Sequence, residues 1–592
     1  MSIYAKRVAL LRDRMKERGI GAYLITSSDD HASEYPASYY EARKWISGFT
    51  GSAGILVVGV EEAGLYTDGR YYIQAEKELD GSSIDLMKQQ DPETMDLLSY
   101  IQKVSKGLAI AGDFTTISAK DGLDLEGLHQ KLVGVDLVNE LWEDRPALPK
   151  EPAFCYPLAY TGVSAKEKIT RLQEKLKEVH GEVQILTTLD DIAYLCNIRG
   201  NDIAYNPMVL SYMMITGKSA TLYVDGEKLS QELEAYLKTE GITWKEYNSF
   251  YQDVKELKNQ SVMVDENRIN YEIYSLLTKN SCVLLDYTNP TYLWKAIKNE
   301  VEIKNTRIAH KKDGLAVTKF IHWLKKEIRT NSSLTEVSVA NVLEELRKAQ
   351  GQYIEPSFTT ISAYGENAAL MHYNPYQRSE EVFLRPEHML LVDSGGQYLE
   401  GTTDITRTIA LGPCSEEEIH HYTVTLKGFL ALMNARFLRG VGGRNLDILA
   451  RGPLWSECMD YRCGTGHGVG HLLGVHEGPN AFRYKETPLH GEDVPIVPGM
   501  ITTDEPGVYV EGAYGIRIEN ELLCVSLSKN EYGEFLGFEP LTWAPIEMDL
   551  VDHSLLSAQE EKWLKDYMEQ VLEHLKDGLT LDEQNWLASL NC

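Results

Sequence analysis

The stretch HMLLVDSGGQYLEGTTDITRTIA, residues 388–410, contains the pattern that decides the fold of the C-terminal half. Four apolar residues lead into Asp393, small residues follow, and a second apolar-rich stretch begins after Asp404. Two strands joined by a short connection are expected to pair antiparallel, which brings Asp393 and Asp404 together at their ends. Adjacent carboxylates repel unless a cation or a proton neutralises them. Because aspartate is common at turns, the pair alone also fits two unrelated strand ends.

A glycine-rich histidine motif follows, CGTGHGVGHLLGVHEGP, residues 463–479. Glycines flank His467 on both sides, and glycine lets a backbone approach a ligand closely. His467 and His471 have the spacing of a zincin helix, but Gly468 stands where that motif needs a glutamate. The glycine density also disfavours a helix, so we expect a loop or a strand. A glycine-rich loop without a metal stays open as an alternative.

The third motif is MITTDEPGVYVEGAYGIRIENELLCV, residues 500–525. It predicts a strand over Met500–Thr503 that leads to Glu505, and a turn at Pro506–Gly507. In the following strand Arg517 and Glu519 share one face, because side chains alternate along a strand. A surface ion pair on an edge strand would show the same pattern.

Together the three motifs supply four carboxylates and one imidazole: Asp393, Asp404, Glu505, Glu519 and His467. An oxygen-rich set with one nitrogen suits Mn²⁺, Fe²⁺, Co²⁺ or Zn²⁺. Five such groups are too many for one catalytic ion, and they suit two ions that share carboxylates and a water.

These motifs resemble the metallopeptidase family built on the pita-bread fold, which includes methionine aminopeptidase, prolidase and Xaa-Pro aminopeptidase. The resemblance implies that Asp393 and Glu519 touch or bridge the two metals. It implies that Asp404 binds one ion, and that His467 and Glu505 bind the other. We expect two divalent cations, and the dominance of carboxylates favours Mn²⁺ over Zn²⁺ or Co²⁺.

Other segments resemble the long, three-domain cytosolic Xaa-Pro aminopeptidases of that family: SSDDHASEY (27–35), RKWISGFTGSAG (43–54), YTDGRYYIQAEKEL (66–79), LDDIAYLCNIRGNDIAYNP (189–207) and FEPLTWAPI (538–546). The implied fold class is α/β, with two creatinase or ribonuclease-H-like domains over residues 1–155 and 156–308. A pita-bread catalytic domain with a C-terminal helical extension is expected over 309–592. The first two segments share one order of helices and strands, which hints at a duplicated fold.

The implied activity is removal of the N-terminal residue from peptides with proline at position 2, through a metal-bridging hydroxide that attacks the scissile carbonyl. Glu505 is the expected proton carrier to the leaving nitrogen. His476 is expected to donate to the developing oxyanion, and His372 to hold the carbonyl or the residue after the cleaved bond. Arg517 is expected to orient carboxylates.

Two further residues carry weaker expectations. Arg70, in the first domain, is a candidate for limiting the site to one residue before the cleaved bond, although a structural turn with Asp68 is the favoured explanation. Cys463 departs from the family pattern, since many relatives have a histidine there. A thiol suits apolar contact with a proline ring better than strong hydrogen bonding, and metal binding or oxidation of Cys463 stays open.

Composition limits the partners of this 592-residue chain. Its net charge of −29 argues against a nucleic-acid binder, and no apolar run is long enough to span a membrane. Eight cysteines without a CxxC pair, and a charged N-terminus without a signal-peptide core, predict a cytoplasmic protein. The resemblance implies a homodimer.

Two other functions compete with this interpretation. A prolidase would cleave only Xaa-Pro dipeptides. A non-catalytic scaffold on the same fold would typically lose metal ligands, whereas this chain keeps all five.

Overall fold

The computed structural model describes residues 2–485 and 494–590. The chain forms two compact units, one of Met1–Leu158 with Val163–Thr291 and one of Ala159–Gly162 with Tyr292–Cys592. The three-domain division expected from the sequence stays a prediction. The first unit holds residues 1–155 and most of 156–308, whereas residues 292–308 belong to the second unit.

The N-terminal unit contains two six-stranded sheets with matching strand order. In the first sheet the order is β4 (Asp85–Lys88), β3 (Ala63–Thr67), β2 (Ile55–Gly59), β1 (Ile20–Ile25), β5 (Ala109–Gly112), β6 (Leu132–Gly134). In the second it is β12 (Ile242–Glu246), β11 (Ala220–Val224), β10 (Ser211–Thr216), β8 (Val183–Leu186), β13 (Ser261–Val264), β14 (Val283–Asp286). Parallel and antiparallel pairs also fall at the same places. The hint of a duplicated fold is therefore confirmed.

Helices cover these sheets with the apolar faces that their sequences predict. Helix α1 (Ile3–Glu17) buries Val8, Leu11 and Met15 in the core of the first sheet. Helix α7 (Ala165–Glu178) begins with a capping box between Ser164 and Glu167, as the Ser-x-x-Glu pattern predicts. Spacings of three and four residues place these apolar side chains on one helix face.

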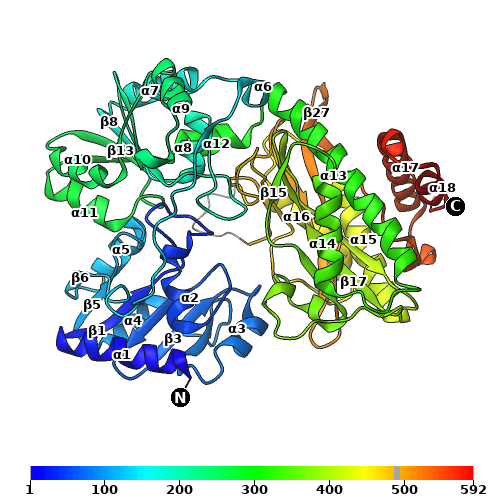
Figure 1. Ribbon diagram of the computed structural model, residues 1–592, viewed down its shortest axis with the longest axis horizontal. Helices are drawn as coiled ribbons and strands as arrows, with labels where there is room; N and C mark the ends of the chain where they lie inside the picture. The colour runs from blue at the N-terminus through cyan, green and yellow to red at the C-terminus, as the bar shows by residue number, and fades with distance from the viewer. Residues whose placement is uncertain (1, 486–493, 591–592) are drawn as a thin grey trace. The chain divides into compact units, whose positions relative to one another are not determined.

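The charged, helix-forming sequence of residues 293–328 predicts one long helix at the start of the second unit. The structure instead has α12 (Pro290–Ala296), a break, and α13 (Glu300–Glu327). The break is explained by Asn299, whose side chain caps α13 in a capping box with Glu302. Figure 1 shows α13 beside α14 (Glu336–Lys348), with which it packs.

Short antiparallel sheets support the motifs in this unit. In one sheet β17 (Met389–Ser394) lies between β16 (Ile361–Tyr364) and β20 (Ile405–Ala410), which confirms the predicted pairing of β17 and β20. A second sheet has the order β21 (Arg436–Leu438), β28 (Gly533–Pro540), β27 (Asn520–Asn530), β24 (Ile501–Asp504). The connection between β17 and β20 forms its own hairpin, β18 (Gly396–Tyr398) with β19 (Gly401–Thr402).

One predicted turn is wrong. Gly507 does not complete a turn after Glu505 but begins β25 (Gly507–Val510), which pairs with β26 (Tyr514–Arg517). Tyr509 of β25 also finds a hydrogen-bond partner on β26, in Arg517. Strand pairing across a close hairpin overrides the local turn preference of the Pro-Gly dipeptide.

The remaining helices of this unit pack around the sheets: α15 (Glu416–Met433), α16 (Gly443–Trp455), α17 (Ala558–Leu575) and α18 (Leu581–Ser589). The last two form the C-terminal helical extension that the sequence predicts. Their apolar residues join those of α15 and β26 in one core, with Leu564, Met568 and Val571 of α17 buried.

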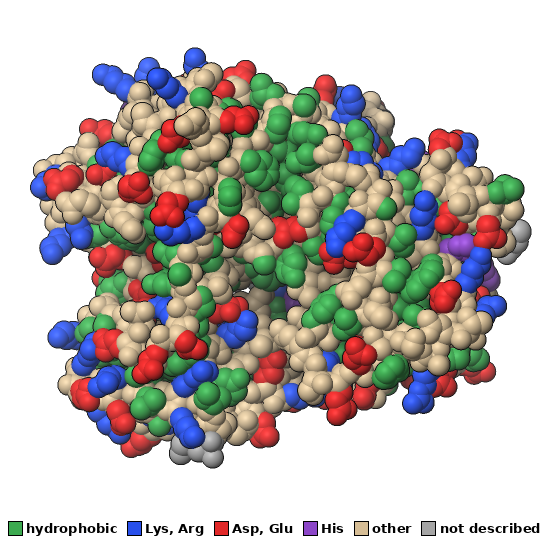
Figure 2. Space-filling model, viewed as in Figure 1, with side chains coloured by type: hydrophobic (Ala, Val, Ile, Leu, Met, Phe, Trp, Pro, Cys, Tyr) green, Lys and Arg blue, Asp and Glu red, His purple; other side chains and the backbone are tan. Residues whose placement is uncertain are grey.

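Three features of the structure bear on the predictions made from composition: the cysteines, the hydropathy of the helices and the distribution of charge. Seven cysteines lie in the described part of the chain, where no disulfide joins one of them to another, and Cys592 lies outside that part. Within that same part, no helix is both long and apolar enough to cross a membrane. Figure 2 shows acidic and basic side chains interspersed on the face it presents. The exclusion of nucleic acid stays a prediction.

Candidate metal centre

The five predicted ligands come from the ends of short strands in the second unit. Asp393 lies in β17 and Asp404 directly precedes β20. His467 lies in β22 (Gly466–His467), which pairs with β23 (Ala481–Phe482), so the expectation of a loop or strand rather than a helix is confirmed. Glu505 follows β24, and Glu519 lies between β26 and β27. Strand ends present side chains from several chain segments at one place.

Three of these side chains form one compact group. Ligand atoms of Asp404, His467 and Glu519 all lie within 4.8 Å of one another. His467 Nε2 is 3.6 Å from Asp404 Oδ2 and 3.4 Å from Glu505 Oε1. Asp393 is near enough to raise the pKa of the other three carboxyls. The structure thus brings together all five predicted residues.

Burial and mutual repulsion disfavour the charged form of the carboxyl groups. Burial raises the pKa of Asp404 and Glu519 well above their ordinary values, and repulsion from the neighbouring carboxylates raises both further. Burial also raises the pKa of Glu505, although the Arg517 guanidinium opposes this. One oxygen of Asp393, Oδ1, is buried without a hydrogen-bond partner. A buried, carboxylate-rich donor set with one imidazole and an unsatisfied oxygen fits divalent cations.

Arg517 links the carboxylates. Its Nη2 donates to Asp393 Oδ2 at 2.5 Å and its Nε donates to Thr406 Oγ1 at 3.2 Å. Thr406 Oγ1 in turn donates to Glu519 Oε2 at 2.7 Å. Arg517 and Glu519, which were predicted to share one strand face, are therefore connected through Thr406. Tyr509, whose hydroxyl accepts from Arg517 Nη1 at 2.6 Å, belongs to the same network.

Two threonines that orient ligands escaped the sequence interpretation. Thr503 is fully buried; its hydroxyl donates to Glu505 Oε1 at 3.1 Å and accepts from the His467 N–H at 2.9 Å. Thr406 holds Glu519 in the same way. Each lies two positions from a ligand, Thr503 before Glu505 and Thr406 after Asp404. Strand alternation puts such residues on the ligand's face, and this signal was available in the sequence.

Replacing Thr503 with valine is expected to lower metal affinity about 10-fold and turnover by a similar factor, because hydrogen bonds that orient ligands typically contribute 10–100-fold. Valine keeps the shape and removes the hydroxyl, so both hydrogen bonds are lost. The measurement is a cation titration followed by peptide hydrolysis at saturating cation. Thr503→Ser is the control, and equal losses in both variants would refute the role of the hydroxyl.

The two histidines expected to contact substrate are placed differently. The His476 ring lies 4.3 Å from the His467 ring, centroid to centroid, at 72°. His372 follows the 3₁₀ turn η4 (Gly365–Ala369), and the carbonyl of its neighbour Met371 accepts from Arg517 Nη2 at 3.3 Å. His476 is thus beside a metal-ligand candidate, and His372 is next in the chain to a residue bound by Arg517.

The other predicted residues have local partners. Cys463 is partly buried against the apolar core, and its carbonyl accepts from Arg451 Nη2 at 2.5 Å. In the N-terminal unit, Arg70 pairs with Asp68 at 2.8 Å and with Glu34 at 3.9 Å. The turn with Asp68 is therefore formed, and a role for Arg70 in substrate length stays a prediction.

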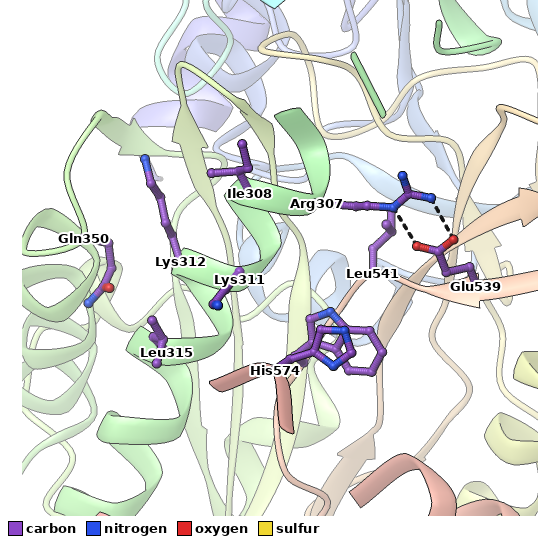
Figure 3. A pocket seen from close by; sticks show the side chains of 10 residues that line it. Arg307, Ile308, Lys311, Lys312, Leu315, Gln350, Glu539, Leu541 and His574 are labelled. Atoms are coloured by element: carbon purple, nitrogen blue, oxygen red, sulfur yellow. Dashed lines mark hydrogen bonds and ion pairs between the residues drawn. The ribbon is translucent and has the colours of Figure 1, made fainter. Parts of the chain in front are cut away.

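A separate cavity of about 520 Å³ lies in the second unit (Figure 3). Its lining includes the bidentate pair Arg307–Glu539, with N–O distances of 2.7 and 2.8 Å, and the stacked rings of Trp543 and His574. None of the five ligand candidates lines it. Carboxylates pair with Arg307 and Lys312 of this lining, and we place the chemistry at the carboxylate cluster, which lies elsewhere.

Comparison with family models covers most of the chain. Residues 304–526 match metallopeptidase family M24, and residues 534–590 match the C-terminal region of peptidase M24. Residues 7–141 and 144–302 each match the creatinase/prolidase N-terminal domain.

Two of the following relatives match nearly the whole chain, and the third matches part of it. A probable Xaa-Pro aminopeptidase P from Paracoccidioides brasiliensis is 38% identical, over 98% of this chain and 98% of the relative. The X-prolyl aminopeptidase of Caenorhabditis elegans, described as a cytosolic enzyme with a di-nuclear active site, is 34% identical with a TM-score of 0.94 and complete coverage of both chains. The Xaa-Pro dipeptidase of Bacillus anthracis is 26% identical with a TM-score of 0.51, over 65% of this chain and 99% of that one. The chain therefore belongs to metallopeptidase family M24, as a metal-dependent aminopeptidase that carries two creatinase/prolidase N-terminal domains.

Proposed function

We propose that this enzyme is an Xaa-Pro aminopeptidase, which releases the N-terminal residue from peptides with proline at position 2. The observation that carries the proposal is similarity over both N-terminal domains and the catalytic domain to relatives named Xaa-Pro aminopeptidase P. The dipeptidase neighbour matches only 65% of this chain.

We propose that Asp393, Asp404, His467, Glu505 and Glu519 hold two divalent cations, and that Mn²⁺ is the native metal. Oxygen donors outnumber nitrogen donors in this set, which favours Mn²⁺ over Zn²⁺. When bound, two such cations supply Lewis-acid chemistry that activates water and polarises a carbonyl. They also neutralise the carboxylates whose pKa burial raises.

The surrounding side chains would perform the proton transfers and binding. Glu505, held by Thr503, would take a proton from the attacking water and pass it to the amide nitrogen, so that proline leaves as an amine. His476 would donate a hydrogen bond to the carbonyl oxygen as negative charge develops there. His372 would hold the peptide near the reacting carbonyl, and Arg517 would fix Asp393.

Proline explains why a dedicated enzyme is needed. An Xaa-Pro bond has no N–H, so a site that requires this donor cannot use such a peptide. We propose that Cys463 gives the proline ring an apolar neighbour and that Arg70 helps to limit the site to one residue before the bond. We also propose a cytoplasmic homodimer; light scattering of the purified protein tests the assembly.

A pair of substrates tests the proposal. The loaded enzyme is expected to cleave Arg-Pro-Pro-type tripeptides and Xaa-Pro-Yaa-Zaa tetrapeptides after the first residue, and to spare the same peptides with alanine in place of proline. Mass spectrometry of the products, with elemental analysis of the protein, measures both specificity and metal content. Cleavage restricted to Xaa-Pro dipeptides would make the enzyme a prolidase, and absence of hydrolysis with two ions bound would favour a scaffold.

A further inference from the structure

Lys298 and Glu477 form a buried ion pair that joins segments 179 positions apart. Their side chains are 1% and 4% exposed, and Lys298 Nζ also donates to the Lys295 carbonyl at 2.8 Å. Replacing a buried ion pair with apolar side chains is often neutral or stabilising, because burial removes two charges from water. Stability is therefore a weak explanation for this pair.

The glutamate end of the pair is connected to both histidines of the site. Glu477 directly follows His476, and its N–H donates to the Gly468 carbonyl at 2.8 Å. Gly468 directly follows His467. A displacement of Glu477 would consequently change the placement of the His476 ring against the His467 ring.

The lysine end is anchored to the rest of the site. The Lys298 N–H donates to the Gly499 carbonyl at 2.9 Å, just before the strand that leads to Glu505. The next residue, Asn299, caps α13 through its side chain. The ammonium group thus extends from a backbone fixed at both a strand entry and a helix start.

Packing leaves the loop around Glu477 little freedom. A Cβ atom at Gly478 would lie 1.8 Å from the Tyr292 hydroxyl, and one at Gly468 would lie 2.1 Å from the Glu477 carbonyl. Asn480 donates to the Ile501 carbonyl of β24 at 2.7 Å. The loop therefore has few alternative positions among which the Lys298–Glu477 pair selects.

We propose that Lys298 is a positioning residue for the aminopeptidase reaction, which acts through its ion pair with Glu477 to orient His476 against His467. The catalytic part of this inference rests on the proposed function, since it gives His476 a task in turnover. The geometric part concerns only where the ring lies.

The test compares Lys298→Met with Lys298→Arg in metal-loaded enzyme, below the unfolding temperature of every variant. Lys298→Met is expected to lower kcat about 10–100-fold with little change in KM, because misplacement by about 1 Å of a group that acts in the transition state has that effect. Lys298→Arg keeps the charge and is expected to recover part of the loss. Lys325→Met is the matched control, since Lys325 pairs with Glu547 at 2.7 Å in the same unit but not at the site.

A second measurement separates this inference from the proposed function. In protein labelled at histidine Cε1, the His476 signal, assigned with His476→Gln, is expected to shift in Lys298→Met and to stay in place in Lys325→Met. An unshifted signal, or equal kcat losses in both methionine variants, overturns the positioning role. If the wild-type enzyme cleaves no Xaa-Pro peptide, the proposed function fails, and the His476 signal still decides the placement.

Discussion

Replacing Glu505 with glutamine is expected to lower kcat/KM for an Xaa-Pro tripeptide by about 10³-fold, within the range for loss of a positioned acid–base group. Glutamine keeps the size and one carbonyl oxygen, so it can still receive the Thr503 hydrogen bond. It cannot carry a proton at neutral pH. The leaving proline nitrogen would then lack its donor, and turnover would slow although substrate still binds.

Metal content separates the two roles assigned to Glu505. Glutamine is a weaker ligand than glutamate, so each preparation is analysed for bound cations before the assay. Inactive protein with two ions bound supports the proton carrier, and recovery of turnover at high cation concentration would leave Glu505 with the ligand role alone. Glu511→Gln, an exposed acid six positions away, is the control and should keep full activity.

Removing the cations with a chelator is expected to abolish activity and to lower the unfolding midpoint of the catalytic unit, most strongly at high pH. A ligand present at 100 times its dissociation constant stabilises a protein by about 2.7 kcal/mol, or roughly 5–10 °C in the midpoint. Without cations, Asp404 and Glu519 are buried together and repel each other. The decrease in the unfolding midpoint should therefore grow with the negative charge on these carboxyls.

The direction of the pH dependence follows from the raised pKa values. Folding raises the pKa of Asp404, Glu505 and Glu519 above the unfolded values of about 4. Protonation of these groups thus favours the folded state; this stabilisation is fully present below the unfolded pKa and is lost as pH rises through the folded pKa. Bound cations replace the protons. The difference in unfolding midpoint between loaded and chelated protein is therefore expected to widen as pH rises.

Calorimetric scans of loaded and chelated protein at pH 5, 6.5 and 8 measure this gap. The variant Asp404→Asn has one charge fewer, and its chelated form is expected to lose less stability between pH 5 and 8 than the chelated wild type. A gap that is constant or that narrows with pH would contradict the assignment of these carboxyls as the cation site.

Most helices and strands could be predicted from the sequence, because the spacing of apolar residues and the capping residues are local patterns. Helix α1 shows its buried face in the spacing of Val8, Leu11 and Met15, and α7 shows its start in Ser164. The paired strands around Asp393 were predictable because two apolar runs with a short connection have few other ways to pair. Where a local preference competed with strand pairing, at Gly507, the local prediction was wrong.

The types of side chain in the candidate metal centre were also predictable from the sequence, because four carboxylates and one histidine in these motifs suit few functions other than metal binding. Their electrostatics were not. Whether Glu519 raises the pKa of Asp404 depends on burial and on distances across strands, and neither is a property of a motif.

What the sequence determined alone is the chemical identity of the ligands, the duplicated order of the N-terminal strands and the apolar faces of the helices. Each depends on residues close together in the chain or on a repeating period. Tertiary structure alone decided that Thr406 holds Glu519 and that Lys298 meets Glu477 179 positions away. Such contacts form only when remote segments fold together, because a hydrogen bond or ion pair depends on distances in space that spacing along the chain does not encode.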